Sequence, residues 1–205
     1  ISMLSTKDIS RLKKQWYREY VVMEFGIYTY QINDVYSALK TKLNSMFGYD
    51  EAAKEFREYY ADKPDEHLPN AYTNVFAGKN VLVIHAESIQ NFLISDDFRG
   101  GKPAVSNGEE VTPNLNRLAS EGLYFSNFYS QESAGTSSDT EFTFNASLLP
   151  ATNGTVFINY FNRDYVTLPK LFNEMGYNTS SMHANRASAW NRQVVHPKLG
   201  YDKLY

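Results

Sequence analysis

Residues 81–92 read VLVIHAESIQNF, in which four apolar residues are followed at once by polar and charged ones. Four consecutive apolar residues, three of them β-branched, are typical of a strand that is buried on both faces of a parallel sheet. Further strand-like runs alternate with helical patterns after this stretch. The sequence therefore predicts an α/β domain with a mostly parallel sheet flanked by helices.

The elements after this first strand can be placed from their own end signals. Thr112 is a suitable N-cap residue, Pro113 suits the first helical position, and Gly122 suits the end of the same helix. The elements are expected in the order helix, strand, helix, helix and strand, over residues 112–122, 123–129, 137–149, 168–175 and 179–183.

The amino-terminal part of the chain carries helical patterns instead. These patterns cover residues 9–20, 29–46 and 51–60. The polar segment 61–69 contains two prolines and is typical of a linker, so we expect a boundary near residues 62–76. We therefore predict a helical linker segment over residues 1–70, followed by an α/β domain over residues 71–205. The pattern leaves open whether the first helices are a linker arm or a part of the domain.

Composition excludes several classes of protein. The chain has 20 Lys and Arg against 23 Asp and Glu, so it lacks the basic excess that binds nucleic acid. It has no cysteine, which excludes disulfides, thiolate zinc sites and cysteine nucleophiles. No apolar run approaches the roughly 20 residues of a membrane-spanning helix. Because the chain begins at Ile1 and not at Met, we expect a fragment, and membrane or targeting segments can lie outside it.

Polar residues at the carboxyl end of the first strand are the first candidates for a site, because ligands of open parallel sheets bind there. Glu87 lies just past that strand. A rigidly held carboxylate is a good ligand for Mg²⁺ or Mn²⁺. Glu87 can equally be an ordinary helix cap, and its position alone favours that interpretation.

A second cluster is the small-residue turn 133–139, which reads SAGTSSD and leads into the helix expected from residue 137. Hydroxyl groups at a helix N-terminus lie in a positive potential beside free N–H groups, which suits a phosphate or an alkoxide nucleophile. The turn matches neither a P-loop nor the G-x-S-x-G nucleophile elbow. The competing interpretation is a row of ordinary N-cap residues.

The third cluster is His183, Trp190 and Arg192, which follow the strand expected over residues 179–183. Arg and His can bind an anionic phosphate while an indole covers the adjoining carbon skeleton. Each residue alone is more simply a surface residue or, for Trp190, a core residue. Three such clusters at three consecutive strand ends are a more specific signal than any one of them.

The clusters lie in four longer motifs, VLVIHAESIQNF (81–92), EEVTPNLNRL (109–118), FSNFYSQESAGTSSDTEFTFNASLLP (125–150) and MHANRASAWNRQVVHPKLGYDKLY (182–205). Together they resemble the extracellular catalytic domain of lipoteichoic acid synthases and primases, which are polyglycerolphosphate transferases of the alkaline phosphatase/sulfatase superfamily. The resemblance implies an alkaline phosphatase/sulfatase-like fold, with the amino-terminal half of that catalytic domain in residues 71–205. More loosely, the helices before it resemble the segment that joins the family's transmembrane helices to its catalytic domain.

The resemblance also implies roles for individual residues. The family holds one divalent cation, expected to be Mn²⁺ with Mg²⁺ as the alternative, through a glutamate that corresponds to Glu87 and through its nucleophile. The nucleophile position corresponds to Ser137, where the family usually has Thr, and the neighbouring Thr136 is the alternative. The family's Asp-His metal pair has no match in this chain. The family's substrate-binding residues correspond to His183, Trp190 and Arg192.

The implied reaction moves glycerolphosphate from phosphatidylglycerol to a lipoteichoic acid chain or a glycolipid anchor, through a covalent Ser or Thr intermediate. The implied location is the extracellular face of a Gram-positive cell membrane, with a parent transmembrane region outside this chain. Two alternatives stay open. One is a phosphatase or other hydrolase of the same superfamily, and the other is a catalytically inactive module that binds headgroups. A sulfatase activity is disfavoured, because the chain has no C/S-x-P-x-R motif.

Overall fold

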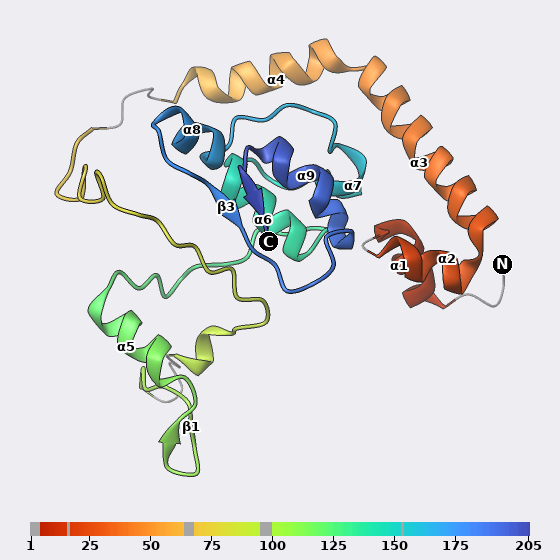
Figure 1. Ribbon diagram of the computed structural model, residues 1–205. Helices are drawn as coiled ribbons and strands as arrows, with labels where there is room; N and C mark the ends of the chain where they lie inside the picture. Colours follow the sequence, from red (N-terminus) through yellow and green to blue (C-terminus); the bar gives the residue numbers. More distant parts are fainter. Residues whose placement is uncertain (1–4, 16, 64–67, 95–99, 153) are drawn as a thin grey trace. The chain divides into compact units, whose positions relative to one another are not determined.

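The computed structural model describes residues 5–15, 17–63, 68–94, 100–152 and 154–205. Tertiary contacts group the chain into two compact units, a first unit of residues 1–81 and 131–205 and a second unit of residues 82–130. The elements of the first unit are α1 (Thr6–Lys14), α2 (Arg18–Phe25), α3 (Ile27–Met46), α4 (Tyr49–Ala61), α6 (Ser137–Ala146), α7 (Val156–Asn159), α8 (Leu168–Glu174), β3 (Ser180–Ser181), the 3₁₀ turn η3 (Ala189–Asn191), α9 (Arg192–Leu199) and β4 (Lys203–Leu204). Those of the second unit are the 3₁₀ turn η1 (Asn91–Leu93), β1 (Val105–Ser106), β2 (Glu109–Glu110) and α5 (Pro113–Glu121) (Figure 1).

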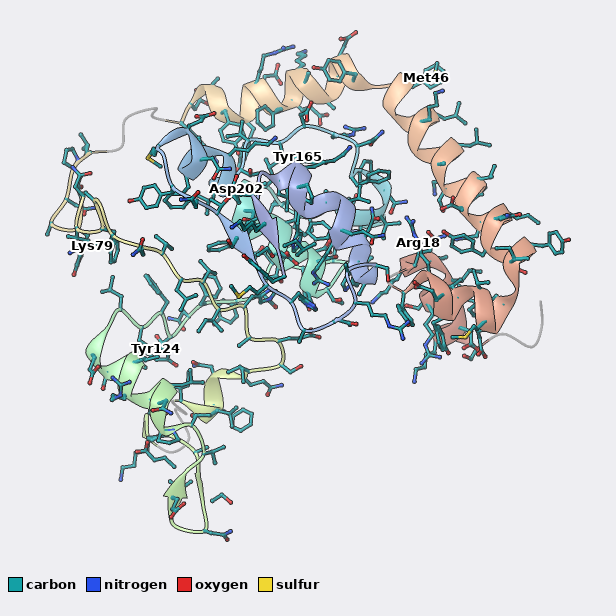
Figure 2. All side chains as sticks on the ribbon, in the orientation of Figure 1. Arg18, Met46, Lys79, Tyr124, Tyr165 and Asp202 are labelled. Atoms are coloured by element: carbon teal, nitrogen blue, oxygen red, sulfur yellow. The ribbon has the colours of Figure 1, made fainter. Side chains whose placement is uncertain are left out.

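The amino-terminal helices form where the sequence predicts them, with one added break. A single helix over residues 9–20 is wrong, because α1 ends at Lys14 and Gln15 adopts a left-handed conformation. At the start of α1, the backbone N–H of Asp8 donates to the Ser5 hydroxyl at 3.2 Å, which caps the helix. The long helix α3 exposes apolar side chains, among them Met46, which is 65% exposed (Figure 2).

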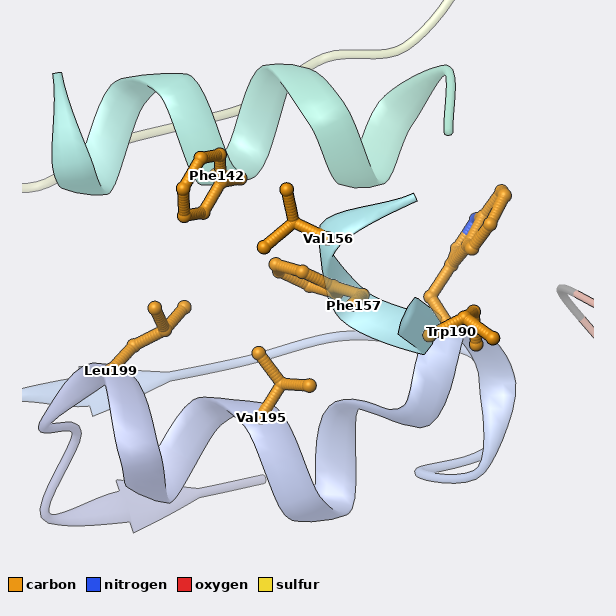
Figure 3. Packing of buried hydrophobic residues seen from close by; sticks show 7 residues of the cluster. Phe142, Val156, Phe157, Trp190, Val195 and Leu199 are labelled. Atoms are coloured by element: carbon orange, nitrogen blue, oxygen red, sulfur yellow. The ribbon is translucent and has the colours of Figure 1, made fainter. Parts of the chain in front are cut away.

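The core of the first unit lies between α6, α7 and α9. Its buried apolar residues are Phe142, Val156, Phe157, Ile158, Trp190, Val195 and Leu199. Figure 3 shows Phe142 of α6 pointing toward α7, while Val195 and Leu199 of α9 point toward the same centre from the opposite side. The helix expected over residues 137–149 is confirmed as α6. The core therefore fixes α6 against α9, and both helices carry candidate site residues.

A parallel strand pair adjoins α9. Strand β3 pairs with β4 in parallel register, with Ser180 opposite Lys203. The backbone N–H of His183 extends the pair by donating to the carbonyl of Tyr205 at 3.1 Å. The connection between the strands contains α9, as a parallel connection requires. The strand expected over residues 179–183 is confirmed, although it is short.

The second unit exposes the apolar runs that the sequence assigns to strands. Leu82 is 86% exposed and Phe128 is 82% exposed. Within the described residues no strand forms at 81–84 or at 123–129, so these two predictions are wrong for this structure. A strand buried on both faces needs neighbouring strands and covering side chains. The part of the chain that the structure describes pairs no strand with either run.

Two local elements of the second unit are well formed. Helix α5 begins at Pro113 and its C-cap residue is Gly122, as predicted. The antiparallel pair of β1 and β2 is closed by Asn107 and Gly108, which have φ values of 51° and 85°. Positive φ at both central residues is what a type I′ hairpin turn requires, and Asn-Gly is the preferred pair for it.

Candidate active site

The turn before α6 is held by the side chain of Asp139. Its Oδ2 atom accepts hydrogen bonds from the backbone N–H groups of Ser133 and Gly135, at 2.9 and 2.8 Å. The hydroxyl of Ser138 donates to the Gly135 carbonyl at 2.8 Å. A Cβ atom on residue 135 would lie 2.1 Å from Oδ1 of Asp139, so only glycine fits there. The buried carboxylate therefore fixes the path of the chain into the helix.

Thr136 has a strained backbone in this turn. Its φ is 46° and its ψ is −117°, a conformation that costs a β-branched residue about 1–3 kcal/mol. Such strain persists only where the surrounding structure enforces it, and it is common at active sites. Thr136 and Ser137 are both partly exposed. Both candidate nucleophiles therefore lie at an accessible point at the start of α6.

The backbone donors at the start of α6 are used within the turn. The N–H groups of residues 138–140 donate to the carbonyls of Gly135 and Thr136. The prediction of free N–H groups is therefore wrong for these three residues. An anion near this helix end is attracted by the helix macrodipole and not by these donors.

A charged cluster joins α6 to α9, one helical turn beyond Ser137. Oε2 of Glu141 accepts hydrogen bonds from Nε and Nη2 of Arg192, each at 3.2 Å. Oε1 of Glu141 lies 2.5 Å from Nε2 of His196, a contact that is an ion pair only when the imidazole is protonated. The exposed fractions of the Arg192, His196 and Glu141 side chains are 4%, 1% and 16%. We call these three residues the Glu141 bridge.

The pKa of the Glu141 carboxyl reflects opposed effects. Burial raises this pKa, whereas the contact with His196 and the charge and hydrogen bonds of Arg192 lower it, and the net result is a pKa below the usual value. Glu141 is therefore ionised at neutral pH and balances the charge of the buried guanidinium. Next to the bridge, burial raises the pKa of Tyr201, whose hydroxyl donates to Asn145 at 2.9 Å.

The three residues of the predicted headgroup cluster lie in different environments. His183 is exposed after β3, where its Nδ1 atom accepts a hydrogen bond from the N–H of Asn185 at 3.0 Å. Trp190 is 8% exposed and packs in the core. Arg192 is buried in the Glu141 bridge. Arg192 is not a solvated surface residue, because its guanidinium pairs with Glu141 in the interior. Its role as a phosphate ligand stays a prediction.

Glu87 is exposed and belongs to the second unit, whereas the α6 hydroxyls belong to the first. The described residues contain no group of three or more His, Cys, Asp or Glu side chains that could hold a metal ion. A carboxylate and a hydroxyl are suitable donor types for a hard divalent cation. They would form only a part of its ligand shell, which has about six members.

Sequence reasoning missed Glu141 and His196. A signal was present, because Glu141 directly precedes the uncharged stretch 142–162, and a carboxylate beside such a stretch is buried only with partners. Arg192 and His196 are four residues apart on α9, so they share one helix face. Together these positions predict a charged contact between two helices, although not which helices meet.

Comparisons with known proteins identify relatives of the chain. The family described as Sulfatase matches residues 79–205. Lipoteichoic acid synthase 1 from Bacillus subtilis (strain 168) is 33% identical over 199 residues, which cover 95% of this chain and 30% of that protein. Lipoteichoic acid synthase from Staphylococcus aureus (strain USA300) is 31% identical over 198 residues, covering 95% and 29%. The chain thus spans about three tenths of the length of these curated relatives.

A solved structure supports the same relationship. The lipoteichoic acid synthase LtaP from Listeria monocytogenes is similar with a TM-score of 0.52 and 30% identity, covering 58% of this chain and 27% of that chain. No helix among the described residues has the length and apolar character to cross a membrane. The match confirms the predicted sulfatase/alkaline phosphatase-like fold class, although the sheets described here are small. Because the family match covers more than half of its residues, the chain belongs to the sulfatase family.

Proposed function

We propose that the chain is part of a phosphoglycerol transferase, which moves glycerolphosphate from phosphatidylglycerol to a lipoteichoic acid chain or a glycolipid anchor. The observation that carries the proposal is the similarity to proteins named lipoteichoic acid synthase, at 31–33% identity over 95% of this chain. The family match over residues 79–205 includes both the α6 turn and the Glu141 bridge. The proposed location is the extracellular face of a Gram-positive membrane, because the donor is a membrane lipid.

The α6 turn supplies the nucleophile. The hydroxyl oxygen of Ser137, with Thr136 as the alternative, attacks the phosphorus of the donor lipid and gives up its proton. The bond from phosphorus to the diacylglycerol oxygen breaks, and diacylglycerol leaves with a proton. A glycerolphosphoryl ester of the enzyme remains. A hydroxyl of the acceptor then attacks the same phosphorus, and the enzyme oxygen leaves and regains a proton.

Other residues bind the headgroup and a cation. Members of the sulfatase family typically use a divalent metal, and Glu87 with the hydroxyl of Ser137 or Thr136 would hold it here, with Mn²⁺ expected and Mg²⁺ as the alternative. A bound cation would lower the pKa of the hydroxyl and offset phosphate charge. The headgroup would be bound by His183, Trp190 and Arg192.

Vesicles containing phosphatidylglycerol with fluorescent acyl chains test this function. A transferase releases labelled diacylglycerol and transfers glycerolphosphate to an added glycolipid. A phosphatase of the same superfamily releases free glycerolphosphate and leaves the glycolipid unmodified. A matched Ser138→Ala variant is a useful control, because Ser138 lies next to the nucleophile but is buried and bonded within the turn.

A headgroup-binding module without catalysis is the second candidate function. The observation that favours it is that the described residues hold no group of three or more metal-ligating side chains. This alternative predicts that the protein binds the same vesicles, but that no labelled diacylglycerol forms with or without added Mn²⁺.

A further inference from the structure

The Glu141 bridge contains two residues that the proposed chemistry does not use. Arg192 has a role there as a headgroup ligand, but Glu141 and His196 have none. Removing charged groups from water costs several kcal/mol per ion unless their partners compensate for it. The side chains of the bridge are at most 16% exposed, so joining α6 to α9 through them costs desolvation free energy.

The hydrogen bonds of Arg192 leave a part of its guanidinium unused. A guanidinium has five N–H donors. Two donate to Oε2 of Glu141, from Nε and Nη2, and one from Nη1 donates to the carbonyl of Ala189 at 3.3 Å. Within the described residues, three of the five donors are thus engaged, and one N–H on each terminal nitrogen remains. A pair of N–H groups on two guanidinium nitrogens is what binds two oxygens of a phosphate together.

The carboxylate of Glu141 is fixed at both oxygens. Oε2 contacts Arg192, and Oε1 contacts His196 on the same face of α9. Glu141 also lies four residues after Ser137, and residues at this spacing share one face of a helix. The bridge therefore connects the helix that begins at the candidate nucleophile with the helix that carries the guanidinium.

We infer that Glu141 is a positioning residue that holds the Arg192 guanidinium in one orientation relative to the hydroxyl end of α6, so that its two remaining N–H groups can receive a phosphate ester. This inference rests on the proposed function, because it takes the transferred phosphate as the ligand of Arg192. Glu141 itself touches no substrate. It acts by restricting the conformations of the Arg192 side chain before a phosphate binds.

The first measurement follows the guanidinium without any substrate. A proton–nitrogen spectrum of arginine side chains should show the Nε–H of Arg192 as a sharp, slowly exchanging signal. Glu141→Gln keeps the size of the side chain but removes its charge, and the signal should then broaden or move to the position of free arginines. Glu121→Gln is the matched control, because Glu121 pairs with Arg117 at 2.9 Å in an exposed contact. The control should leave the Arg192 signal unchanged.

The second measurement is a double-variant cycle on the binding of glycerolphosphate, at a temperature where circular dichroism shows every variant folded. We expect Glu141→Gln and Arg192→Gln each to weaken binding at least about tenfold, as the loss of a charge-assisted contact does. The double variant should bind no more weakly than the poorer single variant, because Glu141 acts through Arg192. If Glu141→Gln does not fold, Glu141→Asp replaces it, since it keeps the charge but shortens the side chain.

The outcomes separate the inference from the proposed function. A merely structural role lowers the unfolding temperature but leaves the folded Glu141 variant within about twofold of the unmodified protein, which overturns the inference. Additive losses in the cycle also overturn it. If the unmodified protein does not bind glycerolphosphate, the proposed function fails and so does the phosphate role of Arg192. The Nε–H signal then still decides whether Glu141 orders the guanidinium.

Discussion

Two phenylalanines show how differently the two units bury their apolar residues. Phe157 in α7 is 0% exposed, whereas Phe128 in the second unit is 82% exposed. Phe157 lies in a core whose members come from α6, α7, α9 and the turn η3 of the same unit. Phe128 lies in a run expected to be a strand, and no strand within the described residues pairs with it.

This contrast explains why the candidate residues of the two units differ in how local structure orders them. A helix satisfies its own backbone hydrogen bonds, so α6 needs only side-chain partners to be fixed. A strand needs the backbone groups of a neighbour. The hydroxyls of Thr136 and Ser137 therefore lie on a packed scaffold, while Glu87 follows an exposed run.

The largest expected effect concerns the two hydroxyl groups at the start of α6. Ser137→Ala should abolish release of diacylglycerol, because it removes the attacking oxygen, and Thr136→Ala should only reduce it. The fluorescent vesicle assay measures both variants. The reverse pattern would assign the nucleophile to Thr136.

The corresponding prediction for the second unit concerns Glu87, which is exposed. Glu87→Ala should abolish metal-dependent turnover, because it removes the carboxylate proposed to hold the cation. Its exposed position predicts a change of less than about 0.5 kcal/mol in the free energy of unfolding. Calorimetric titration of Mn²⁺ and urea unfolding measure the two quantities. A metal affinity equal to that of the unmodified protein would exclude Glu87 as a ligand.

A matched pair of substitutions measures the contrast in packing directly. Phe157→Ala should lower the free energy of unfolding by about 3–5 kcal/mol, because it opens a cavity in the core. Phe128→Ala should change it by less than about 0.5 kcal/mol, since the ring is already exposed. Urea unfolding of both variants gives the comparison. Similar losses in the two variants would show that Phe128 is buried in solution.

The sequence predicted the helices well because their signals are local. Residues Thr112, Pro113 and Gly122 bound α5 as expected. The hairpin turn at Asn107 and Gly108 has an equally local signal that sequence reasoning overlooked. The strand at 81–84 was predicted from apolar character, but that character produces a buried strand only where partner strands meet it.

The candidate site was predicted in its residue types but not in its contacts. Asp139 and Ser138 were expected to be N-cap residues, whereas they hold the turn from within. Local sequence patterns could not predict that Arg192 pairs with Glu141, because Glu141 lies 51 residues before it. An ion pair between two helices depends on how the helices pack, and no short stretch of sequence contains that information.

A smaller effect is expected for Arg192→Lys. Lysine keeps the charge but cannot reproduce paired hydrogen bonds to phosphate and to Glu141. The loss of one charge-assisted contact costs about 1.5–3 kcal/mol, so glycerolphosphate binding should weaken at least about tenfold. Titration of glycerolphosphate into the folded variant measures this change. Affinities within about twofold of each other would remove Arg192 from the headgroup site.

The smallest expected effect is a loss of stability at acid pH, which protonation of the buried Glu141 carboxyl should cause. The pKa of Glu141 is lower in the folded protein than its ordinary value of 4.5, with Arg192, His196 and Tyr201 as the titratable or charged groups beside it. Its contribution to stability is therefore fully present above about pH 5, and it is lost as the pH falls through the lowered folded pKa.

Urea unfolding between pH 7 and pH 3 tests this assignment. The protein should lose stability on the acid side of pH 5, because the folded state must then accept a proton that the unfolded state accepts more readily. Glu141→Gln should start from a lower stability and lose less over the same range, since it has no carboxyl to protonate. The exposed Glu121→Gln control should keep the acid limb of the unmodified protein. If the Glu141 and Glu121 variants lose the same free energy of unfolding between pH 7 and pH 3, the Glu141 bridge does not govern the response to acid.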